Sequence, residues 1–438
     1  MRKVLMVSPH FPPDATAAAH RVRLLAPRLP DYGWEPTVVA VDPRDYEGRL
    51  DPGLAELVPS DLRVVRCRAL SPRWTRRVGI GDLGLRAFAG LGTTCARLLR
   101  RERFDALFIT IYPTYPALLG PMLKRRFGVP FVLDYQDPWV GGWGRTVGAG
   151  PGGRVDLKSR LARALAVRLE PIAVRAADAI TAVSAATYEQ VVARYPGLLR
   201  IPCAAIPVGA EVADFAALRE RPRPNPHFEP REDRVHIAYV GTVLPLGFET
   251  LRAVLAAVGL LRVRRPDLYA RIRLHFVGSS NQTASDVAPR VLPLAQGLGL
   301  EGVVTEHPLR IDYLDALTVL SQADAILLMG STESHYTASK LYPALLARRP
   351  LLAVFHRDSS VVDLLSRAAP SPSARVVTYD DTVRPQARIE AIYAELREIV
   401  ERPIYEADAI DQRVIKECSA DALAGRLAEI LARVSERG

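Results

Sequence analysis

Short apolar runs alternate with longer amphipathic stretches along almost the whole chain. In the first half the runs stand at residues 4–7, 37–41, 106–110, 131–134, 179–183 and 204–207. Each run is long enough for one buried strand, and residues 15–30 and 157–175 have the apolar spacing of helices. Strands that alternate with helices in this way predict a parallel, doubly wound sheet.

The same pattern restarts after residues 219–234, which hold four prolines and many charges and so are typical of a linker. We expect an α/β protein in which two doubly wound, Rossmann-like domains face each other across a cleft. The domains are 1–215 and 235–402, with a linker at 216–234 and C-terminal helices at 403–438 that pack back toward the first domain. The second half is predicted to have strands at 236–240, 273–277, 303–306, 325–329 and 351–355, and helices at 247–262, 288–298, 312–321, 386–401 and 419–436.

The composition agrees with a two-domain protein of the cytoplasm. A chain of 438 residues with 49% apolar residues is too long for one ordinary core. No apolar run reaches the ~18 residues of a membrane span, and the start reads as a strand rather than a signal peptide. The four cysteines are scattered and are expected to be reduced thiols. No His, Asp or Glu cluster has metal-ligand spacing, so we expect no metal and no cofactor.

Positive charge is concentrated in residues 62–103. The chain has a net charge of +10, and this stretch contains eleven arginines opposed only by Asp82 and Glu102. Such a stretch attracts phosphate groups, and an anionic membrane at the inner face is one partner that it fits. A solvated basic face is the alternative. Few aromatic residues interrupt the arginines and no nucleic-acid-binding motif is present, so nucleic acid is not a predicted partner.

Residues 324–355 form the most informative segment. A buried run is followed by a polar loop, a helix that opens near Ser339, and a further buried run after Pro350. Such a helix N-terminus suits a phosphate, because its free N–H groups and dipole favour negative charge. Lys340 beside it would oppose the dipole unless an anion lay between them. A capping Ser339 with a solvated Lys340 is the alternative.

Two polar residues in the first half stand at or just beyond strand ends. His10 and Asp137 are the catalytic candidates, since a carboxylate there can orient or deprotonate an acceptor hydroxyl. Both also suit turns, and Asp137 precedes Pro138. Trp139 and Trp143 stand in a glycine-rich stretch that suits stacking on a sugar. Packing under the loop is the alternative for both tryptophans.

Six motifs in order resemble the family 4 group of nucleotide-sugar-dependent, retaining glycosyltransferases. The two halves with their proline-rich break are similar to the GT-B fold of those enzymes. The motifs are Ser-Pro-His-Phe-Pro-Pro at 8–13, the strand ending in Asp and Trp at 131–139, Ala-Asp-Ala-Ile-Thr-Ala-Val-Ser at 177–184, Tyr-Val-Gly-Thr at 239–242, Phe-Val-Gly at 276–278 and Ser-Lys-Leu-Tyr at 339–342.

The resemblance implies a metal-independent transfer from a nucleotide sugar, which is a substrate and not a cofactor. The acceptor would be a sugar, a lipid-linked or cell-envelope glycan, or a small secondary metabolite, held by the first domain. Lys340 and the residues just before it would stabilise the leaving diphosphate. The donor-binding candidates are Gly241, Thr242, Gly278, Glu333, His335, Thr337, Ser339, Lys340 and Leu341.

The chain departs from the family pattern in three places. Residues 14–20 stand where a glycine-rich turn is usual, and Thr242 follows the second-domain glycine where a basic residue is usual. Pro343 replaces a glutamate that bonds the donor ribose, and Glu333 is the candidate replacement. A pseudo-transferase that has lost donor binding, or an unusual donor, is therefore the alternative. An epimerase shares the fold but would need more carboxylates and histidines than the sequence offers.

Overall fold

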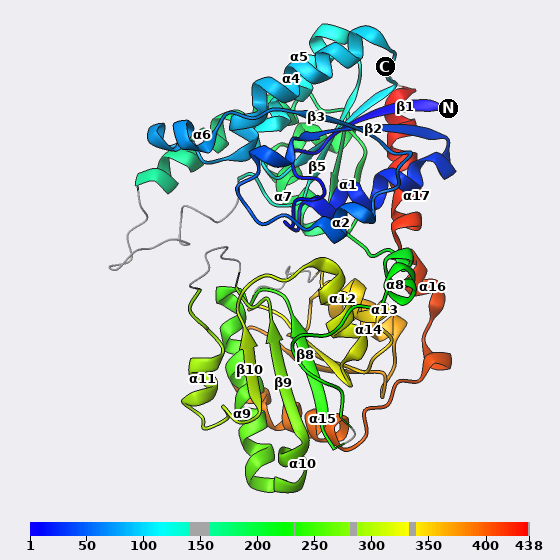
Figure 1. Ribbon diagram of the computed structural model, residues 1–438. Coiled ribbons are helices and arrows are strands. Elements are labelled where there is room, and N and C mark those ends of the chain that lie inside the picture. The colour runs from blue at the N-terminus through cyan, green and yellow to red at the C-terminus, as the bar shows by residue number, and fades with distance from the viewer. Residues whose placement is uncertain (141–156, 232, 281–286, 333–338, 437–438) are drawn as a thin grey trace. The chain divides into compact units, whose positions relative to one another are not determined.

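The computed structural model shows two α/β units (Figure 1). It describes residues 1–140, 157–231, 233–280, 287–332 and 339–436. The first unit is Met1–Val208 together with Ala420–Gly438, and the second is Gly209–Ser419. The chain therefore passes between units at Val208, before the proline-rich segment predicted as a linker, which lies in the second unit. None of the helices in the described ranges is both long and apolar enough to cross a membrane.

The first unit is built on a seven-stranded parallel sheet of order β3-β2-β1-β4-β5-β6-β7. Every strand predicted for this half is present. The edge strand β3 was not predicted, because its sequence Arg-Val-Val-Arg-Cys lacks a continuous apolar run. The strands are β1 Arg2–Val7, β2 Trp34–Val41, β3 Arg63–Cys67, β4 Ala106–Ile111, β5 Phe131–Tyr135, β6 Ala179–Ala182 and β7 Cys203–Ala205.

Helices cover both faces of this sheet, because alternate strand residues point to opposite sides. Leu5 and Val7 of β1 share a core with α4, α5 and α6. Val4 and Met6 share another with α1 and α17. The helices are α1 Ala19–Leu25, α2 Pro52–Glu56, α3 Pro72–Thr75, α4 Leu83–Arg101, α5 Leu119–Phe127, α6 Leu157–Val174, α7 Ala185–Arg194 and α17 Ala420–Ser435, with 3₁₀ turns η1 Ala26–Tyr32, η2 Pro43–Asp45, η3 Arg76–Val78, η4 Tyr115–Leu118 and η5 Pro196–Arg200.

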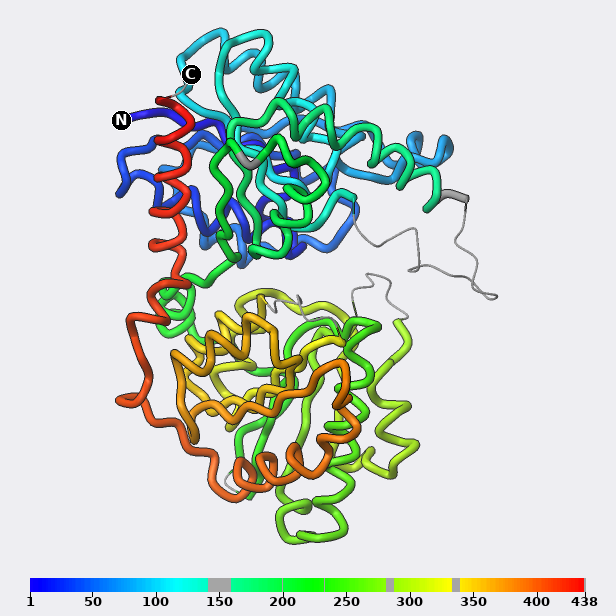
Figure 2. The backbone as a smooth tube through the Cα atoms, turned by 180° about the vertical axis from the view of Figure 1, so that it is seen from behind, coloured from blue at the N-terminus to red at the C-terminus, as the bar shows by residue number. Residues whose placement is uncertain are grey.

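Two details of this unit depend on particular residues. The helix predicted at 15–30 is shorter, since the prolines of η1 tighten its second half into a 3₁₀ turn. The C-terminal helix α17 lies beside the start of the chain in both views (Figures 1 and 2). There, Arg2 donates hydrogen bonds to the Ser435 hydroxyl (3.2 Å) and the Glu436 carboxylate (3.3 Å).

The second unit repeats the design with a six-stranded parallel sheet of order β10-β9-β8-β11-β12-β13. The prediction of two doubly wound parallel sheets is confirmed. The strands are β8 Val235–Val240, β9 Ile272–Val277, β10 Val304–His307, β11 Ala325–Met329, β12 Leu351–His356 and β13 Ala374–Tyr379; the helices are α8 Val212–Glu220, α9 Phe248–Arg264, α10 Pro266–Arg271, α11 Leu292–Gln296, α12 Tyr313–Gln322, α13 Leu341–Leu346, α14 Ser360–Ala368, α15 Ile389–Glu401 and α16 Gln412–Glu417; the 3₁₀ turns are η6 Pro245–Gly247, η7 Pro385–Arg388 and η8 Ala407–Ala409.

The strand order of each sheet changes direction once. In the first unit the change lies between β1 and β4, and in the second it lies between β8 and β11. In open parallel sheets, ligands bind beyond the carboxyl ends of the strands at such a point. These two edges are therefore where functional side chains are expected.

Candidate functional site

Two glycines at the carboxyl ends of β8 and β9 form the floor of the candidate site. Gly241 has a φ of +118° and Gly278 a φ of +69°, values that side-chain-bearing residues rarely adopt. The Gly241 N–H donates to the Val277 carbonyl (2.7 Å), so the sheet ladder continues up to the turn. A Cβ on Gly278 would lie 3.9 Å from the Gly241 backbone, so the two turns lie side by side.

Lys340 lies directly across Gly241. A Cβ on Gly241 would come within 2.5 Å of the lysine Cε, so only glycine leaves this path open. The Lys340 Nζ donates to the Tyr239 hydroxyl (2.5 Å) and the Thr242 carbonyl (2.7 Å), and it lies 4.4 Å from the centre of the Tyr239 ring. The turn after β8 therefore holds the lysine in a fixed position.

The chemistry of Lys340 follows from this environment. Burial lowers the pKa of its amine to about 7. Its two acceptors are neutral oxygens, and no carboxylate of the described residues pairs with the amine. An ammonium has three N–H donors, and the two contacts with described residues leave one for a ligand. The site is therefore suited to an anion, which would supply the missing negative charge.

The helix after Lys340 differs from the prediction. It begins at Leu341 rather than near Ser339, and it is only six residues long. Ser339 is exposed, Leu341 is 1% exposed, and no side chain caps the helix. The argument from a helix N-terminus is therefore weaker than expected, and the contacts of Lys340 with β8 replace it. Pro343 stands in the first turn, where proline is tolerated.

Three of the predicted donor-binding residues lie outside the described residues. They are Glu333, His335 and Thr337. Hydrogen bonds of Tyr379 hold the chain just before them. The Tyr379 hydroxyl donates to the Ser331 carbonyl (2.7 Å) and accepts from the Thr250 hydroxyl (3.2 Å). The sequence pointed to Gly241, Thr242, Gly278 and Lys340, which the structure brings together, but not to Tyr239 or Tyr379 as their supports.

In the first unit His10 follows β1 at the point where the strand order changes. Its Nδ1 forms a hydrogen bond with the carboxylate of Asp14, which is buried. Its ring stacks on Tyr112, which follows β4, with ring centres 5.5 Å apart, and on Tyr46 at 6.2 Å. A carboxylate on Nδ1 orients the imidazole and fixes the tautomer with which Nε2 can act. The roles of Asp14 and Tyr112 were not apparent from the sequence.

Asp137 follows β5, the next strand of the sheet after β4. The residue is exposed, yet protein atoms crowd its carboxyl, and this partial burial raises its pKa. Within the described ranges, no hydrogen bond or ion pair joins Asp137 to His10. A carboxyl with a raised pKa is a candidate proton acceptor or donor.

The two tryptophans have different outcomes. Trp139 is 2% exposed and packs edge-on against Tyr115 with ring centres 6.1 Å apart, within the core under α4 and α6. Its position is that of the packing alternative, and a direct acceptor contact for it stays a prediction. Trp143 lies outside the described residues.

A buried ion pair fixes the carboxyl end of β5. Arg21 and Asp134 are both 0% exposed, and the guanidinium donates to the carboxylate at 2.8 Å and 2.5 Å. Arg21 also donates to the carbonyls of Ile206 (2.6 Å) and Pro207 (2.9 Å). The pair therefore holds α1, β5 and the end of β7 together, a role that sequence spacing could not show.

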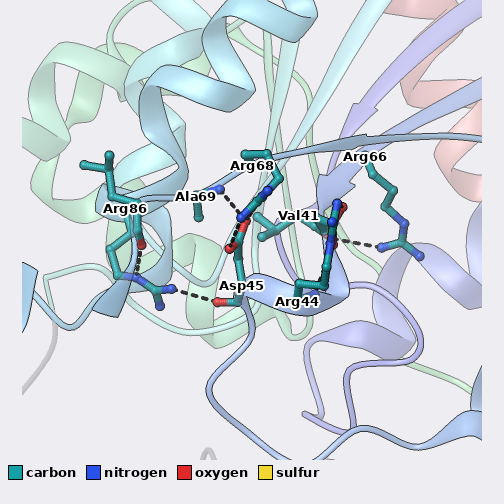
Figure 3. Close-up of polar contacts among 9 residues, drawn as sticks. Val41, Arg44, Asp45, Arg66, Arg68, Ala69 and Arg86 are labelled. Carbon is teal, nitrogen blue, oxygen red and sulfur yellow. Dashed lines mark hydrogen bonds and ion pairs between the residues drawn. The ribbon is translucent and has the colours of Figure 1, made fainter. Parts of the chain in front are cut away.

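Several arginines of the stretch 62–103 are paired with acidic residues that lie outside it in the sequence. Asp45 accepts from Arg68 (2.7 Å), and its backbone carbonyl accepts from Arg86 (2.7 Å), as Figure 3 shows. Glu47 accepts from Arg86 as well (2.6 Å). Arg66 is directed to the Val41 carbonyl at 3.1 Å. Part of the positive charge of residues 62–103 is therefore paired with acids of the first unit, and only Arg86 among these arginines is buried.

Within the ranges that the structure describes, no group of three His, Cys, Asp or Glu residues has the arrangement of a metal site. The four cysteines are free thiols.

Comparisons with known proteins agree with this architecture. Residues 16–209 match the family profile of the glycosyl transferase 4-like domain. No curated protein sequence matches the chain.

Solved structures resemble the chain over its whole length. They include the catalytic domain of starch synthase IV from Arabidopsis thaliana bound to ADP and acarbose (11% identity, TM-score 0.60, 100% of both chains). A UDP-forming α,α-trehalose-phosphate synthase from Burkholderia xenovorans matches at 12% identity and TM-score 0.60 over 99% of both chains. The N-terminal domain of a Candida albicans trehalose-6-phosphate phosphatase matches at 13% identity and TM-score 0.60, over 99% of this chain and 97% of that one. Identities this low show the fold alone.

Proposed function

We propose that this chain, a glycosyltransferase with the GT-B fold, transfers a sugar from a nucleotide-sugar donor to an acceptor hydroxyl. One observation carries the proposal. Lys340 lies across Gly241 at the carboxyl ends of β8 and β9, and its contacts within the described residues leave one N–H spare and include no carboxylate. A nucleoside diphosphate is the anion that a glycosyl transfer releases, and the starch synthase with a similar fold was solved with ADP.

The reaction needs negative charge to be stabilised where the bond breaks. As the sugar leaves, charge grows on the diphosphate oxygens, and a cation already held in place lowers the barrier without moving. Lys340 has that position because Tyr239 and Thr242 hold its amine. We propose a metal-independent reaction on this ground, since the chain itself supplies the cation. Retention of the anomeric configuration is proposed from the family resemblance alone.

The acceptor is proposed to bind at the first unit. His10, oriented by Asp14, and Asp137, with its raised pKa, are the candidate groups for the acceptor hydroxyl. A sugar, a lipid-linked or cell-envelope glycan, or a small metabolite would each present such a hydroxyl. Trp143 remains a candidate for stacking on it.

We also propose that the protein is cytoplasmic and that it contacts the anionic inner face of the membrane peripherally. The free thiols fit a reducing compartment. Within residues 62–103, fewer arginines are exposed, and so able to contact a membrane, than the sequence contains. The exposed ones are Arg63, Arg68, Arg73, Arg76, Arg77, Arg97, Arg100, Arg101 and Arg103. Four of these also pair with acids, namely Arg63, Arg68, Arg76 and Arg103.

The donor assignment is tested by Lys340→Ala, with Lys416→Ala as the matched control. Lys416 is an exposed lysine of α16 in the same unit. Losing a charge-assisted contact of about 1.5–3 kcal/mol should weaken nucleoside diphosphate binding roughly ten- to a hundredfold. Titration calorimetry with UDP, GDP, ADP and dTDP measures this, and a product assay with the matching sugars follows. Equal affinity in both variants would contradict the assignment.

A non-catalytic protein with the same fold is the second candidate, and Pro343 is the observation that favours it. Its position in the first turn of α13 has no side-chain acceptor for a ribose. We propose instead that Glu333 accepts from the ribose hydroxyls, so Glu333→Gln should weaken nucleotide binding. Absence of binding by every nucleoside diphosphate to folded protein would favour the non-catalytic candidate.

A further inference from the structure

Helix α6 in the first unit has apolar residues on two opposite sides. Its inner side is fully packed, with Ala166, Ala173 and Val174 in the core beside α4 and α5. A surface helix with one packed side normally presents polar residues outward. The outward side of α6 instead carries an apolar stripe.

The stripe is formed by three large side chains at helical spacing. Leu161 is 61% exposed, Leu165 39% and Ile172 54%. Positions four and seven apart lie on one face of a helix, so the three side chains form one row. Val167 beside the row is also exposed, and Met122 on the neighbouring helix α5 is 57% exposed.

Arginines stand within and beside this stripe, and α6 has no exposed acid. Arg160, Arg168 and Arg175 are exposed, and none of them forms an ion pair with another described residue. The single acid of α6, Glu170, is fully buried and accepts from Arg194 and Tyr135. Among the described residues, the outward side of the helix is thus apolar and cationic.

A shallow hollow lies at the C-terminal half of the stripe. Its volume is about 520 Å³, and it is lined by Val167, Arg168, Pro171, Ile172, Arg175 and Ala176. Two guanidinium groups beside apolar walls match a phosphate headgroup that is joined to an acyl chain.

We propose that the outward stripe of α6 inserts into the interfacial region of an anionic phospholipid bilayer. Leucine and isoleucine side chains enter the boundary of the acyl chains, while the arginines extend to the headgroup phosphates. A second copy of the chain is a poorer occupant, because a symmetric contact would bring the arginines of both copies together. The surface belongs to the first unit and does not depend on the donor assignment.

Vesicle sedimentation tests the proposal. The full chain should bind vesicles of equal parts phosphatidylglycerol and phosphatidylcholine, and bind pure phosphatidylcholine less. The triple variant Leu161→Ser, Leu165→Ser, Ile172→Ser should bind at least roughly tenfold more weakly, since burying apolar side chains drives interfacial binding. Arg168→Ala with Arg175→Ala should reduce the preference for anionic lipid, while the arginines of 62–103 keep part of it. The matched control Val212→Ser, Val263→Ser, Leu298→Ser alters three exposed apolar residues of the second unit and should bind as the unaltered chain does.

Two further readouts separate insertion of the stripe from purely electrostatic adsorption and from dimer formation. The tryptophan of the Leu165→Trp variant should add fluorescence emission. This added emission should be quenched when the vesicles contain brominated phosphatidylcholine mixed with phosphatidylglycerol. Binding through the arginines of 62–103 alone would vanish at high salt and would be indifferent to the stripe variant, a result that overturns the proposal. So would a dimer in sedimentation velocity that the triple variant converts to monomer, since the stripe would then belong to a second copy.

Discussion

A pair of buried histidines in the second unit should make its stability depend on pH. His236 on β8 and His275 on β9 are 5% and 4% exposed, and Nδ1 of the first lies 2.9 Å from Nε2 of the second. One nitrogen must donate and the other accept, so the contact cannot hold two imidazolium ions. Phe228 stacks on both rings at 4.7 Å and 4.6 Å. His275 Nδ1 also lies 2.8 Å from the Thr305 hydroxyl.

The sign and size of the effect follow from the pKa values. Burial lowers the pKa of both histidines. For His275, burial and the charge of the neighbouring His236 together lower the pKa to about 3. An unfolded histidine titrates near 6.5, so the unfolded chain binds more protons below that pH. The stabilisation is complete above about pH 6.5 and is lost as the pH falls toward 3. When the pH falls from about 7 to about 5, His275 alone should lower the free energy of unfolding of the second unit by about 2 kcal/mol.

Hydrogen exchange of the β8 and β9 amides is the suitable assay. All four tryptophans lie in the first unit, so their fluorescence does not report on the second. The free energy of opening in β8 and β9 should fall between about pH 7 and pH 5, and His275→Gln should reduce this fall by about 2 kcal/mol. His20→Gln, in the first unit, is the control and should leave it unchanged. An equal pH dependence in the His275→Gln variant would refute the reasoning.

Three further outcomes are expected. Gly241→Ala should weaken nucleoside diphosphate binding in calorimetry, because its Cβ would meet Lys340 at 2.5 Å and the backbone φ is +118°. Asp134→Asn should lower the free energy of unfolding of the first unit by about 3–5 kcal/mol in urea titrations followed by tryptophan fluorescence, since Arg21 would be left buried without its counter-charge. Diphosphate binding at about pH 8 should take up nearly one proton, measured by calorimetry in buffers of different ionisation enthalpy, because an anion raises the lowered pKa of Lys340.

The architecture was readable from the sequence because its parallel strands are buried on both faces. Such strands appear as continuous apolar runs, as in β1, β4 and β11. The two strands that were missed, β3 and β13, lie at sheet edges and mix arginine with valine. An edge strand pairs with only one neighbouring strand and is only partly covered by helices, so its sequence lacks the continuous apolar run that marks a central strand.

The unit boundaries were harder to predict, because they depend on contacts between distant residues. The proline-rich segment has the composition of a linker, yet Phe228 within it packs on the histidines of β8 and β9. Composition describes the local preference of a segment for extended backbone. It does not reveal that a single aromatic ring anchors the segment to a sheet.

Charge counted along the sequence overstates how much of the surface charge is unpaired. Asp45 and Glu47 lie outside residues 62–103 and bind Arg68 and Arg86 from within it. Three-dimensional pairing therefore removes charges that a window of sequence counts as free. The converse holds for α6, whose apolar residues at 157–175 predicted only a helix. Which of those residues lie outward became visible only once the inner side was packed.

The role of Lys340 illustrates how a residue can be identified before the reason for it is known. The sequence favoured an anion near Lys340 because a cation at a helix N-terminus opposes the dipole. The structure weakens that reason, since α13 has six residues and the amine is turned toward β8. It supplies a stronger one. A partly buried amine with two neutral acceptors and a lowered pKa is an unsatisfied cation, and it is held over Gly241, where the sheet changes direction. The case for an anion thus depends on contacts between residues about a hundred positions apart.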